Sequence, residues 1–341
     1  MKNVHLRNFL ILAAVGVLCV AVPGVLIHFW IIDAYTAQIL TLGGINAIMA
    51  VSVNMICGIT GQLSLGQAGF MAIGAYSCAL LTQAGVPLAV SILISALITC
   101  VFGIVIGFPT LKLQGDYLAI VTLGFGEIIR VLLVNFKDLT GGANGKQFPT
   151  LLVSYADLAY ILIVGSLVVI IALLQNFLRS TYGRAILAVR EDEIAANSSG
   201  IGVFRYKMIG FVIAAFIAGI GGALYAPFIG FIKPDLASFN RSIDYLIFVV
   251  LGGMGSVTGS VLAAFVLTYL QEFLRFLQDY RLVFYPLILI CVMLFRPQGF
   301  LGMKELSFVR VWERLPEWRK LLGARLRRRG LSKENTDANA K

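Results

Sequence analysis

The chain of 341 residues is 59% hydrophobic and 13% charged, with a formal net charge of +10. Soluble domains carry about a quarter charged residues, so this composition excludes an ordinary soluble protein and indicates an integral membrane protein. The positive charge does not indicate a nucleic-acid partner, because much of it lies in 179–207 and 310–341, beside apolar runs.

Apolar runs long enough to enter a bilayer follow one another along the chain, since a hydrocarbon core near 30 Å needs about 20 helical residues. They predict an all-α fold, a polytopic transmembrane bundle of about eight to ten helices. The runs are 9–29, 37–57, 66–83, 87–109, 117–136, 156–177, 207–229, 244–278 and 282–296.

The first run, Phe9 to Phe29, follows Lys2 and Arg7, as the apolar part of a secretory signal would. It is too long for a signal, however, and it lacks a small-residue cleavage pattern before Asp33. We therefore predict an uncleaved first helix.

The basic residues predict the orientation, because Lys and Arg beside spanning helices mark the cytoplasmic side. Successive crossings from a cytoplasmic N-terminus place Asp33 and the 137–146 loop outside, and Lys112 and the 179–206 loop inside. Both ends of the chain are then expected in the cytoplasm.

The same pattern divides the chain into a transmembrane domain, 1–302, and a basic cytoplasmic tail, 303–341. Contact with anionic membrane lipid explains the basic residues of the tail. Its last ten residues, 332–341, are polar enough to be disordered.

A polar, glycine-rich segment lies between the second and third apolar runs. Lipid cannot hydrogen-bond freed backbone groups, so irregular backbone at this depth survives only where protein buries it or where it lines a wet cavity. We predict a pathway for a polar solute here. Close helix packing explains the glycines equally well, but it does not explain the polar side chains among them. The candidate pathway residues of this segment are Gly58, Gly61, Gln62, Ser64, Gly66 and Gln67.

A second glycine cluster interrupts 244–278, a run too long for one spanning helix. It predicts a re-entrant hairpin or a closely broken helix pair, and it adds Gly252, Gly255 and Ser256 to the candidate pathway. One glycine-interrupted segment in each half of the chain is typical of transporters with internal repeats. The internal match is weak, so a repeat and a packing role for the glycines both stay open.

The cytoplasmic loop 179–206 has an alanine-rich middle that favours a short helix ending at Gly200. A loop this long usually has a function of its own, and we predict that it docks another protein. The alternative is an amphipathic helix resting on lipid head groups, where the acidic triplet 191–193 would be repelled.

Two pairs of opposite charges lie within apolar runs, Glu127 with Arg130 and Glu272 with Arg275. Each pair is spaced i,i+3, so its side chains share one helix face and can neutralise each other. Charged residues in a membrane are candidates for substrate contact, and a structural role is the alternative.

Motifs for catalysis and for metal binding are missing from the sequence. His5 and His28 form no pair, and the five cysteines show no metal-ligand spacing. There is no phosphate-binding glycine loop and no nucleophile beside a base. We expect no metal, no cofactor, no catalytic residue and no enzymatic activity of the chain itself.

Five segments in order resemble the membrane permeases of bacterial ABC importers for branched-chain amino acids, and the resemblance covers roughly 35–302. The strongest is Gly58-Ile-Thr-Gly-Gln-Leu-Ser-Leu-Gly-Gln-Ala-Gly-Phe-Met-Ala-Ile-Gly-Ala-Tyr76. The other four are 139–145, 183–196, 251–256 and 295–302.

The resemblance implies a permease in the inner (plasma) membrane of a bacterium that imports leucine, isoleucine or valine. It implies four kinds of partner contact: a second related permease, two cytoplasmic ATPase subunits that bind ATP, an extracytoplasmic binding protein, and membrane lipid. Urea, amides and other amino acids are alternative substrates within the family. An ion-coupled secondary carrier and a channel are the alternatives outside it.

In such a permease the cytoplasmic loop is the coupling helix that contacts the ATPases. The family often has an acid before Ala-Ala, but Ile194 occupies that place here and Glu193 lies one position earlier. Half-helix N-termini near Gly61 or Gly255 could face a substrate carboxylate. The coupling residues implied by the resemblance are Gly183, Arg184, Arg190, Glu191, Glu193, Ala195, Ala196 and Gly200.

Overall fold

The computed structural model describes residues 20–21, 23–27, 29, 33–113, 115–150, 152, 156–296, 299–300 and 302. The greater part of the predicted first helix and the whole of the basic tail lie outside these residues, so both remain predictions.

Six helices of the described chain are long and apolar enough to cross a bilayer. Together with the near absence of strand in this part of the chain, they confirm the predicted all-α, polytopic membrane bundle. The six are α2 with η1 (Ala34–Ile59), α4 (Leu88–Thr110), α5 (Asp116–Asn135), α7 (Ala156–Arg179), α10 (Val203–Ile229) and α12 (Val257–Phe273).

Three shorter helices complete the bundle: α3 (Gln67–Gln83), α11 (Phe239–Gly252) and α13 (Arg281–Phe295). The predicted total of eight to ten crossings and the predicted internal repeat stay predictions, since shorter helices need not cross. The minor elements are α6 (Lys137–Thr140), η2 (Gly142–Asn144), β1 (Lys146–Gln147), α8 (Thr181–Glu191), α9 (Glu193–Ser198), β2 (Phe231–Ile232), η3 (Pro234–Ala237) and η4 (Leu274–Tyr280).

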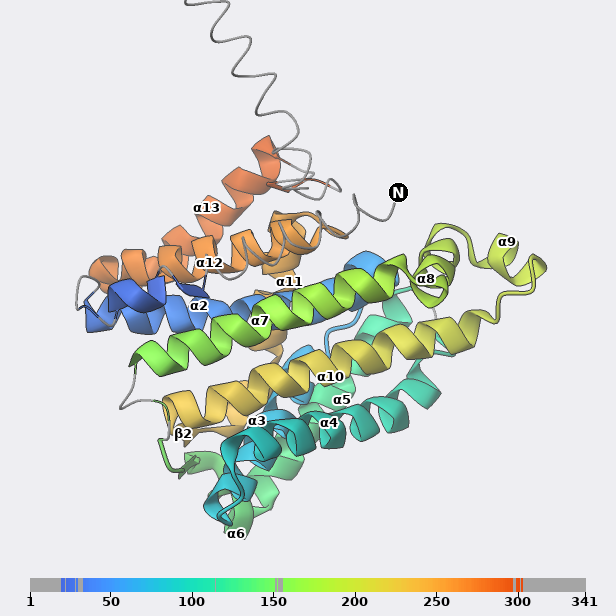
Figure 1. Ribbon diagram of the computed structural model, residues 1–341. Coiled ribbons are helices and arrows are strands. Elements are labelled where there is room, and N and C mark those ends of the chain that lie inside the picture. The colour runs from blue at the N-terminus through green and yellow to red at the C-terminus, as the bar shows by residue number, and fades with distance from the viewer. Residues whose placement is uncertain are drawn as a thin grey trace, which may run out of the picture. The chain divides into compact units, whose positions relative to one another are not determined.

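The helices differ in how far protein encloses them. The α2–η1 span is 83% buried, whereas α5 is 28% buried, so α5 presents most of its apolar surface outward. Helix α2 packs against α12, α7 and α10, and α3 packs against α10 and α4. In Figure 1, α8 and α9 lie at one end of α7 and α10, and β2 lies at the opposite end.

Glycines allow α3 and α10 to pack backbone to backbone. A Cβ at Gly74 would lie 2.8 Å from Gly219 Cα, and a Cβ at Gly222 would overlap the Met71 carbonyl. Small residues are the usual means of close helix packing in membranes, where no hydrophobic effect drives helices together.

Both predicted ion pairs form. Arg130 Nε lies 2.6 Å from Glu127 Oε2, and Arg130 also approaches Asp235 of η3 at 3.8 Å. Arg275 Nη1 lies 2.9 Å from Glu272 Oε1, which also accepts a hydrogen bond from Tyr35 at the start of α2. Each pair therefore links two elements of the bundle as well as neutralising charge.

Candidate functional site

The first predicted glycine segment is a break between α2 and α3, as expected. Helix α2 ends in a π-helix, η1 (Asn54–Ile59), and the chain then runs without helix to Gly66. Gly61 has a φ of +71°, a backbone conformation that residues with a Cβ rarely adopt. Short π-helical turns within α-helices are frequent at functional sites.

The second predicted segment is the broken helix pair. Helices α11 and α12 pack against each other, and the chain turns between them at Gly253 and Gly255, whose φ angles are +105° and +89°. A Cβ at Gly252 would lie 2.5 Å from Gly259 C, and a Cβ at Gly259 would overlap the Gly252 carbonyl. Positions 252 and 259 therefore both need glycine. The Ser256 hydroxyl accepts a hydrogen bond from Gly259 N at 3.1 Å and caps α12.

The two breaks meet, although about two hundred positions separate them in the sequence. Gly255 N donates to Asn54 Oδ1 at 2.8 Å. A Cβ at Gly58 would lie 2.9 Å from Gly255 Cα and would overlap Asn54 Oδ1. We call this contact, between 54–61 and 253–256, the glycine junction.

Residues after α13 cover the second break. Phe300 N donates to Leu251 O at 2.7 Å. A Cβ at Gly253 would lie 3.0 Å from Gly302 C, so that only glycine fits against this segment. Phe300 and Gly302, from one of the segments that carry the family resemblance, thus lie against the second break.

Polar side chains of the first break are buried with incomplete hydrogen bonding. The exposed fractions of Gln62, Ser64 and Gln67 are 4%, 2% and 1%, and that of Asn54 is 0%. Gln67 Oε1 accepts from Ser52 Oγ at 3.0 Å. Seven buried side-chain atoms of the described chain have no hydrogen-bond partner, and five of them lie in this segment: Asn54 Nδ2, Gln62 Oε1 and Nε2, Ser64 Oγ, and Gln67 Nε2.

A buried polar group without a partner costs about 1–3 kcal/mol. Four such residues lie within one segment of 14 residues, so they would lower the stability of the fold considerably if their only role were packing. A polar solute or water passing this segment would satisfy them. Asn54 was not predicted, because a single Asn in an apolar run does not reveal from the sequence that it faces another break.

The loop 179–206, predicted to be cytoplasmic, forms two helices, α8 and α9, where the sequence suggested one. Asp192 has an extended backbone and its carboxylate accepts hydrogen bonds from Ile194 N at 2.8 Å and Ala195 N at 3.0 Å. An N-cap of this kind starts a new helix. The expected end is present at Gly200, which has a φ of +80°.

Several predicted coupling residues have structural explanations. A Cβ at Gly183 would lie 2.5 Å from Phe177 O, so glycine allows the tight turn from α7 into α8. Arg184 donates to Arg179 O at 2.8 Å across the same turn. Ala196 is buried, whereas Ala195 and Glu191 are exposed. Their role in coupling stays a prediction.

Glu193 forms an ion pair with Lys207 at the start of α10. The Lys207 side chain is 8% exposed and that of Glu193 is 40% exposed. A buried lysine needs such a partner, because removing it would leave an uncompensated charge. The pair joins α9 to α10 and gives the acid at position 193 a partner within the chain. Next to it, Ile194 is 81% exposed.

Arg190 is the predicted coupling residue that reaches the glycine junction. Its Cγ lies 3.0 Å from the place that a Cβ of Gly61 would occupy, and its Nη1 lies 3.1 Å from the equivalent place at Gly255. The structure therefore brings together one residue of the predicted coupling loop and both predicted pathway segments.

Two charges were missed at the start of α11. Arg241 and Asp244 lie one turn apart and interact electrostatically with each other and with Tyr225 and Tyr245. The i,i+3 spacing that revealed the other two pairs was present here as well. It was overlooked because Arg241 precedes the apolar run.

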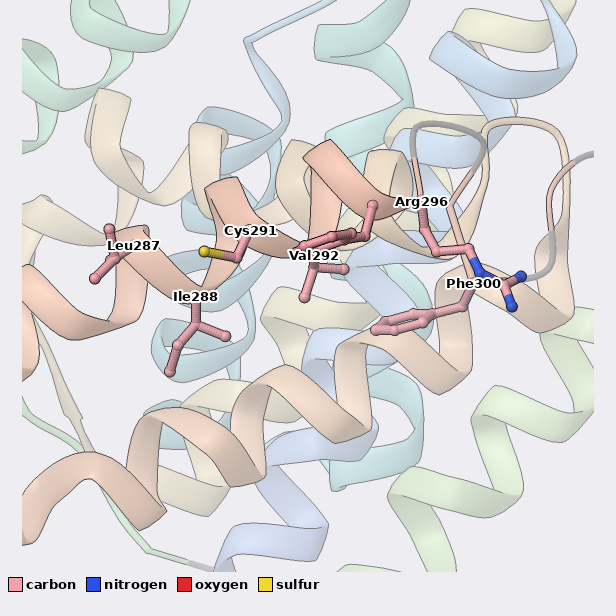
Figure 2. A pocket seen from close by; sticks show the side chains of 7 residues that line it. Leu287, Ile288, Cys291, Val292, Arg296 and Phe300 are labelled. Carbon is pink, nitrogen blue, oxygen red and sulfur yellow. The ribbon is translucent and has the colours of Figure 1, made fainter.

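The best-formed pockets lie away from the junction's polar side chains. Figure 2 shows one along α13, an apolar cavity of about 540 Å³ that includes Ile288, Cys291 and Val292. A second, of about 380 Å³, lies between α2 and α12 and contains the Glu272–Arg275 pair. Neither lining includes a predicted pathway residue.

Comparisons with known proteins identify the family. The model of the family described as "Branched-chain amino acid transport system / permease component" matches residues 35–293. The chain belongs to this family. No solved structure matches it.

Three relatives that match most of the chain are all named as permease proteins of high-affinity branched-chain amino acid transport systems. The chain is 38% identical over 327 residues to the high-affinity branched-chain amino acid transport system permease protein LivM of Escherichia coli K12, covering 87% of this chain and 76% of LivM. It is 29% identical over 299 residues to BraD of Pseudomonas aeruginosa, covering 79% and 95%. It is 25% identical over 293 residues to LivH of Escherichia coli K12, again covering 79% and 95%.

Proposed function

We propose that this chain is the permease subunit of an ATP-driven ABC importer that moves leucine, isoleucine or valine into the cell across a bacterial inner membrane. The observation that carries the proposal is the glycine junction, where a cytoplasmic loop touches a break that holds buried polar side chains. The family match over 35–293 supports the substrate class and the multi-subunit assembly.

A zwitterionic amino acid needs polar contacts for its ammonium and carboxylate groups and apolar walls for its side chain. Near Gly61 and Gly255, three backbone donors at the helix starts are engaged within the chain: Gly255 N donates to Asn54, Gly259 N to Ser256, and Ala68 N to Ser242. We therefore assign the polar contacts to the side chains of Gln62, Ser64 and Gln67, which retain unused donors or acceptors. The apolar walls come from buried neighbours such as Ile59 and Phe70.

The cytoplasmic face supplies the site for the ATPase subunits, on which we place ATP binding and hydrolysis. On α9, Ile194 is 81% exposed while the Glu193–Lys207 pair holds the helix to α10. A large apolar side chain on an anchored helix suits insertion into a groove of a partner. The remaining partners of the proposed importer are a second related permease and an extracytoplasmic binding protein.

The first test is co-purification of the tagged chain from native membranes in a mild detergent, with mass spectrometry of the proteins that accompany it. The expected result is a second permease and nucleotide-binding subunits. The assembled complex, reconstituted in liposomes with the binding protein, is expected to take up radiolabelled leucine only with ATP. Uptake by the chain alone, driven by an ion gradient, would instead establish a secondary carrier.

A point variant tests the docking site more sharply than removal of the loop. Deleting 190–200 abolishes ATPase association in the proposed importer, but it also removes the partner of buried Lys207. Ile194→Glu leaves that pair in place and is expected to release the ATPase subunits from a folded permease. Asn197→Glu is the matched control, because it adds the same charge at another exposed position of α9 without removing an apolar side chain.

Competition identifies the solute. Unlabelled leucine, isoleucine and valine are expected to compete for uptake by the complete complex, whereas urea and short amides are not. The reverse order of competition would assign the chain to the amide and urea importers of the same family. Reporter fusions at the two termini check that both lie in the cytoplasm.

A further inference from the structure

We propose that Arg190 is a positioning residue that transmits movement of the cytoplasmic loop to the glycine junction, and thereby sets the separation of the two breaks. The inference rests on the proposed function. It concerns the side of the loop that faces the membrane helices, whereas docking of the ATPases concerns the opposite, exposed side.

The first step is the position of the side chain. Arg190 is at the end of α8, next to buried Val189 and one turn after buried Ile186. Its guanidinium group also approaches Glu191 Oε1 at 4.0 Å, and its side chain is 23% exposed. A side chain so enclosed has little freedom to change its place without moving its neighbours.

The second step is that the two breaks are shaped to receive this side chain. The stem of Arg190 passes Gly61, since its Cγ and Cβ lie 3.0 and 3.6 Å from the place of a Cβ there. Its Nη1 and Cζ lie 3.1 and 3.9 Å from the place of a Cβ at Gly255. One long side chain thus contacts both sides of the junction where neither has a side chain.

The third step is that the loop has a second attachment to the same break. The Glu193–Lys207 pair joins α9 to α10, and Gly210, one turn further along α10, packs against Thr60 at the end of η1. Helix α8 is held at its other end by the tight turn at Gly183. Arg190 lies between these two attachments. A displacement of the loop between them must therefore move Arg190 within the junction.

The chemistry of arginine suits this role. The stem is aliphatic and can lie against backbone, and the guanidinium group is planar and always charged. Gly255 N already donates to Asn54, so a shift of the guanidinium group relative to Gly255 also disturbs the hydrogen bond that holds the two breaks together. The buried amides of Gln62 and Gln67 belong to the same break as Asn54 and follow it along the chain.

The test uses the full complex in liposomes, with transport and ATP hydrolysis measured in the same sample. Arg190→Ala removes both contacts, and Arg190→Met keeps the stem at Gly61 but removes the guanidinium group at Gly255. We expect both to lower the number of leucine molecules transported per ATP by about tenfold, within the usual range of coupling between sites, while the ATPase subunits still co-purify. Arg205→Met is the control, because Arg205 is an exposed arginine on the same cytoplasmic side.

A conformational readout separates transmission from a merely structural role. Cys57 lies in η1 and is half-buried, so it can report on the junction once the other four cysteines are changed to Ala. Trapping the ATPases with ATP and vanadate is expected to change the maleimide labelling rate of Cys57 by about fivefold. Arg190→Met is expected to abolish that change.

The outcomes are distinct. An unchanged transport-to-ATP ratio in both Arg190 variants, an equal loss in Arg205→Met, or an ATP-dependent change at Cys57 that survives Arg190→Met overturns the inference while the importer stands. Loss of the ATPase subunits in Arg190→Met also overturns it, because Arg190 would then be a docking residue. Failure of the unaltered chain to co-purify with ATPases would end the proposed function and the inference together.

Discussion

The two glycine breaks have similar sequences but differ in what explains them. In the second break, Gly252 and Gly259 pack backbone to backbone and Ser256 caps α12, so packing and capping account for the residues. In the first break, packing accounts for Gly58 and Gly66, but Gln62 keeps both of its amide atoms without partners.

The difference shows that glycine content does not distinguish a packing site from a solute path. The polar side chains do, because a buried polar atom without a partner is stable only when something else compensates it. We therefore predict that the second break supports the first structurally. Four predictions test this division, in order of decreasing effect.

Gly259→Leu should have the largest effect. A Cβ at this position would overlap the Gly252 carbonyl, so α11 and α12 could not pack as they do. Overpacking against fixed backbone costs about 3 kcal/mol or more, and we expect little folded protein by fluorescence-detected gel filtration. Gly124→Leu is the control, since no atom lies within 4 Å of a Cβ there. Normal folding of Gly259→Leu would show that the hairpin is not a packing site.

Gly61→Leu and Gly255→Leu compare the breaks directly. Both glycines have positive φ and both would meet the Arg190 side chain, and each variant carries a backbone cost of about 1–2 kcal/mol. If 58–67 lines the path, Gly61→Leu should lower transport per folded molecule by about tenfold, with a smaller loss of expression. Equal losses of transport and expression in both variants would favour packing as the role of both breaks.

Gln62→Leu separates stability from transport. Replacing an amide that lacks hydrogen-bond partners by an apolar group of similar size removes a penalty of about 1–3 kcal/mol. We expect an unchanged or higher melting temperature together with about tenfold slower leucine uptake. Unchanged uptake would remove the first break from the path.

Ser256→Ala should have the smallest effect. Loss of its cap on Gly259 N costs about 1 kcal/mol, so we expect a melting temperature lower by a few degrees and normal uptake per folded molecule. The matched variant Ser64→Ala removes a hydroxyl without a partner and is expected to slow uptake at unchanged stability. Slower uptake in Ser256→Ala together with a lower melting temperature in Ser64→Ala would instead assign the path to the second break and the supporting role to the first.

Local features of the sequence predicted much of this structure. Apolar runs gave the helices, glycine with polar residues gave both breaks, and i,i+3 spacing gave the ion pairs of Glu127 and Glu272. These features depend on residues within one or two helical turns of each other. The family match confirmed the resemblance that five segments had indicated.

The meeting of the two breaks could not be predicted, because it is built from contacts between residues far apart in the sequence. The hydrogen bond from Gly255 to Asn54 joins residues 201 positions apart. Arg190 and Glu193 are both charged residues of the same loop. Arg190 reaches the glycine junction, whereas Glu193 forms an ion pair with Lys207 of α10. The residues next to Arg190 and Glu193 in the sequence do not indicate which of the two contacts each side chain makes.

The contact of Phe300 with Leu251 sets an order of events during biosynthesis. The first break leaves the ribosome long before Gly255, and the second break is covered only once residue 300 has been made. Because the N-terminal part of a chain is made first, Asn54 is in place before Gly255, its hydrogen-bond partner, has been made. We therefore expect truncation before residue 300 to leave the hairpin between α11 and α12 without this cover.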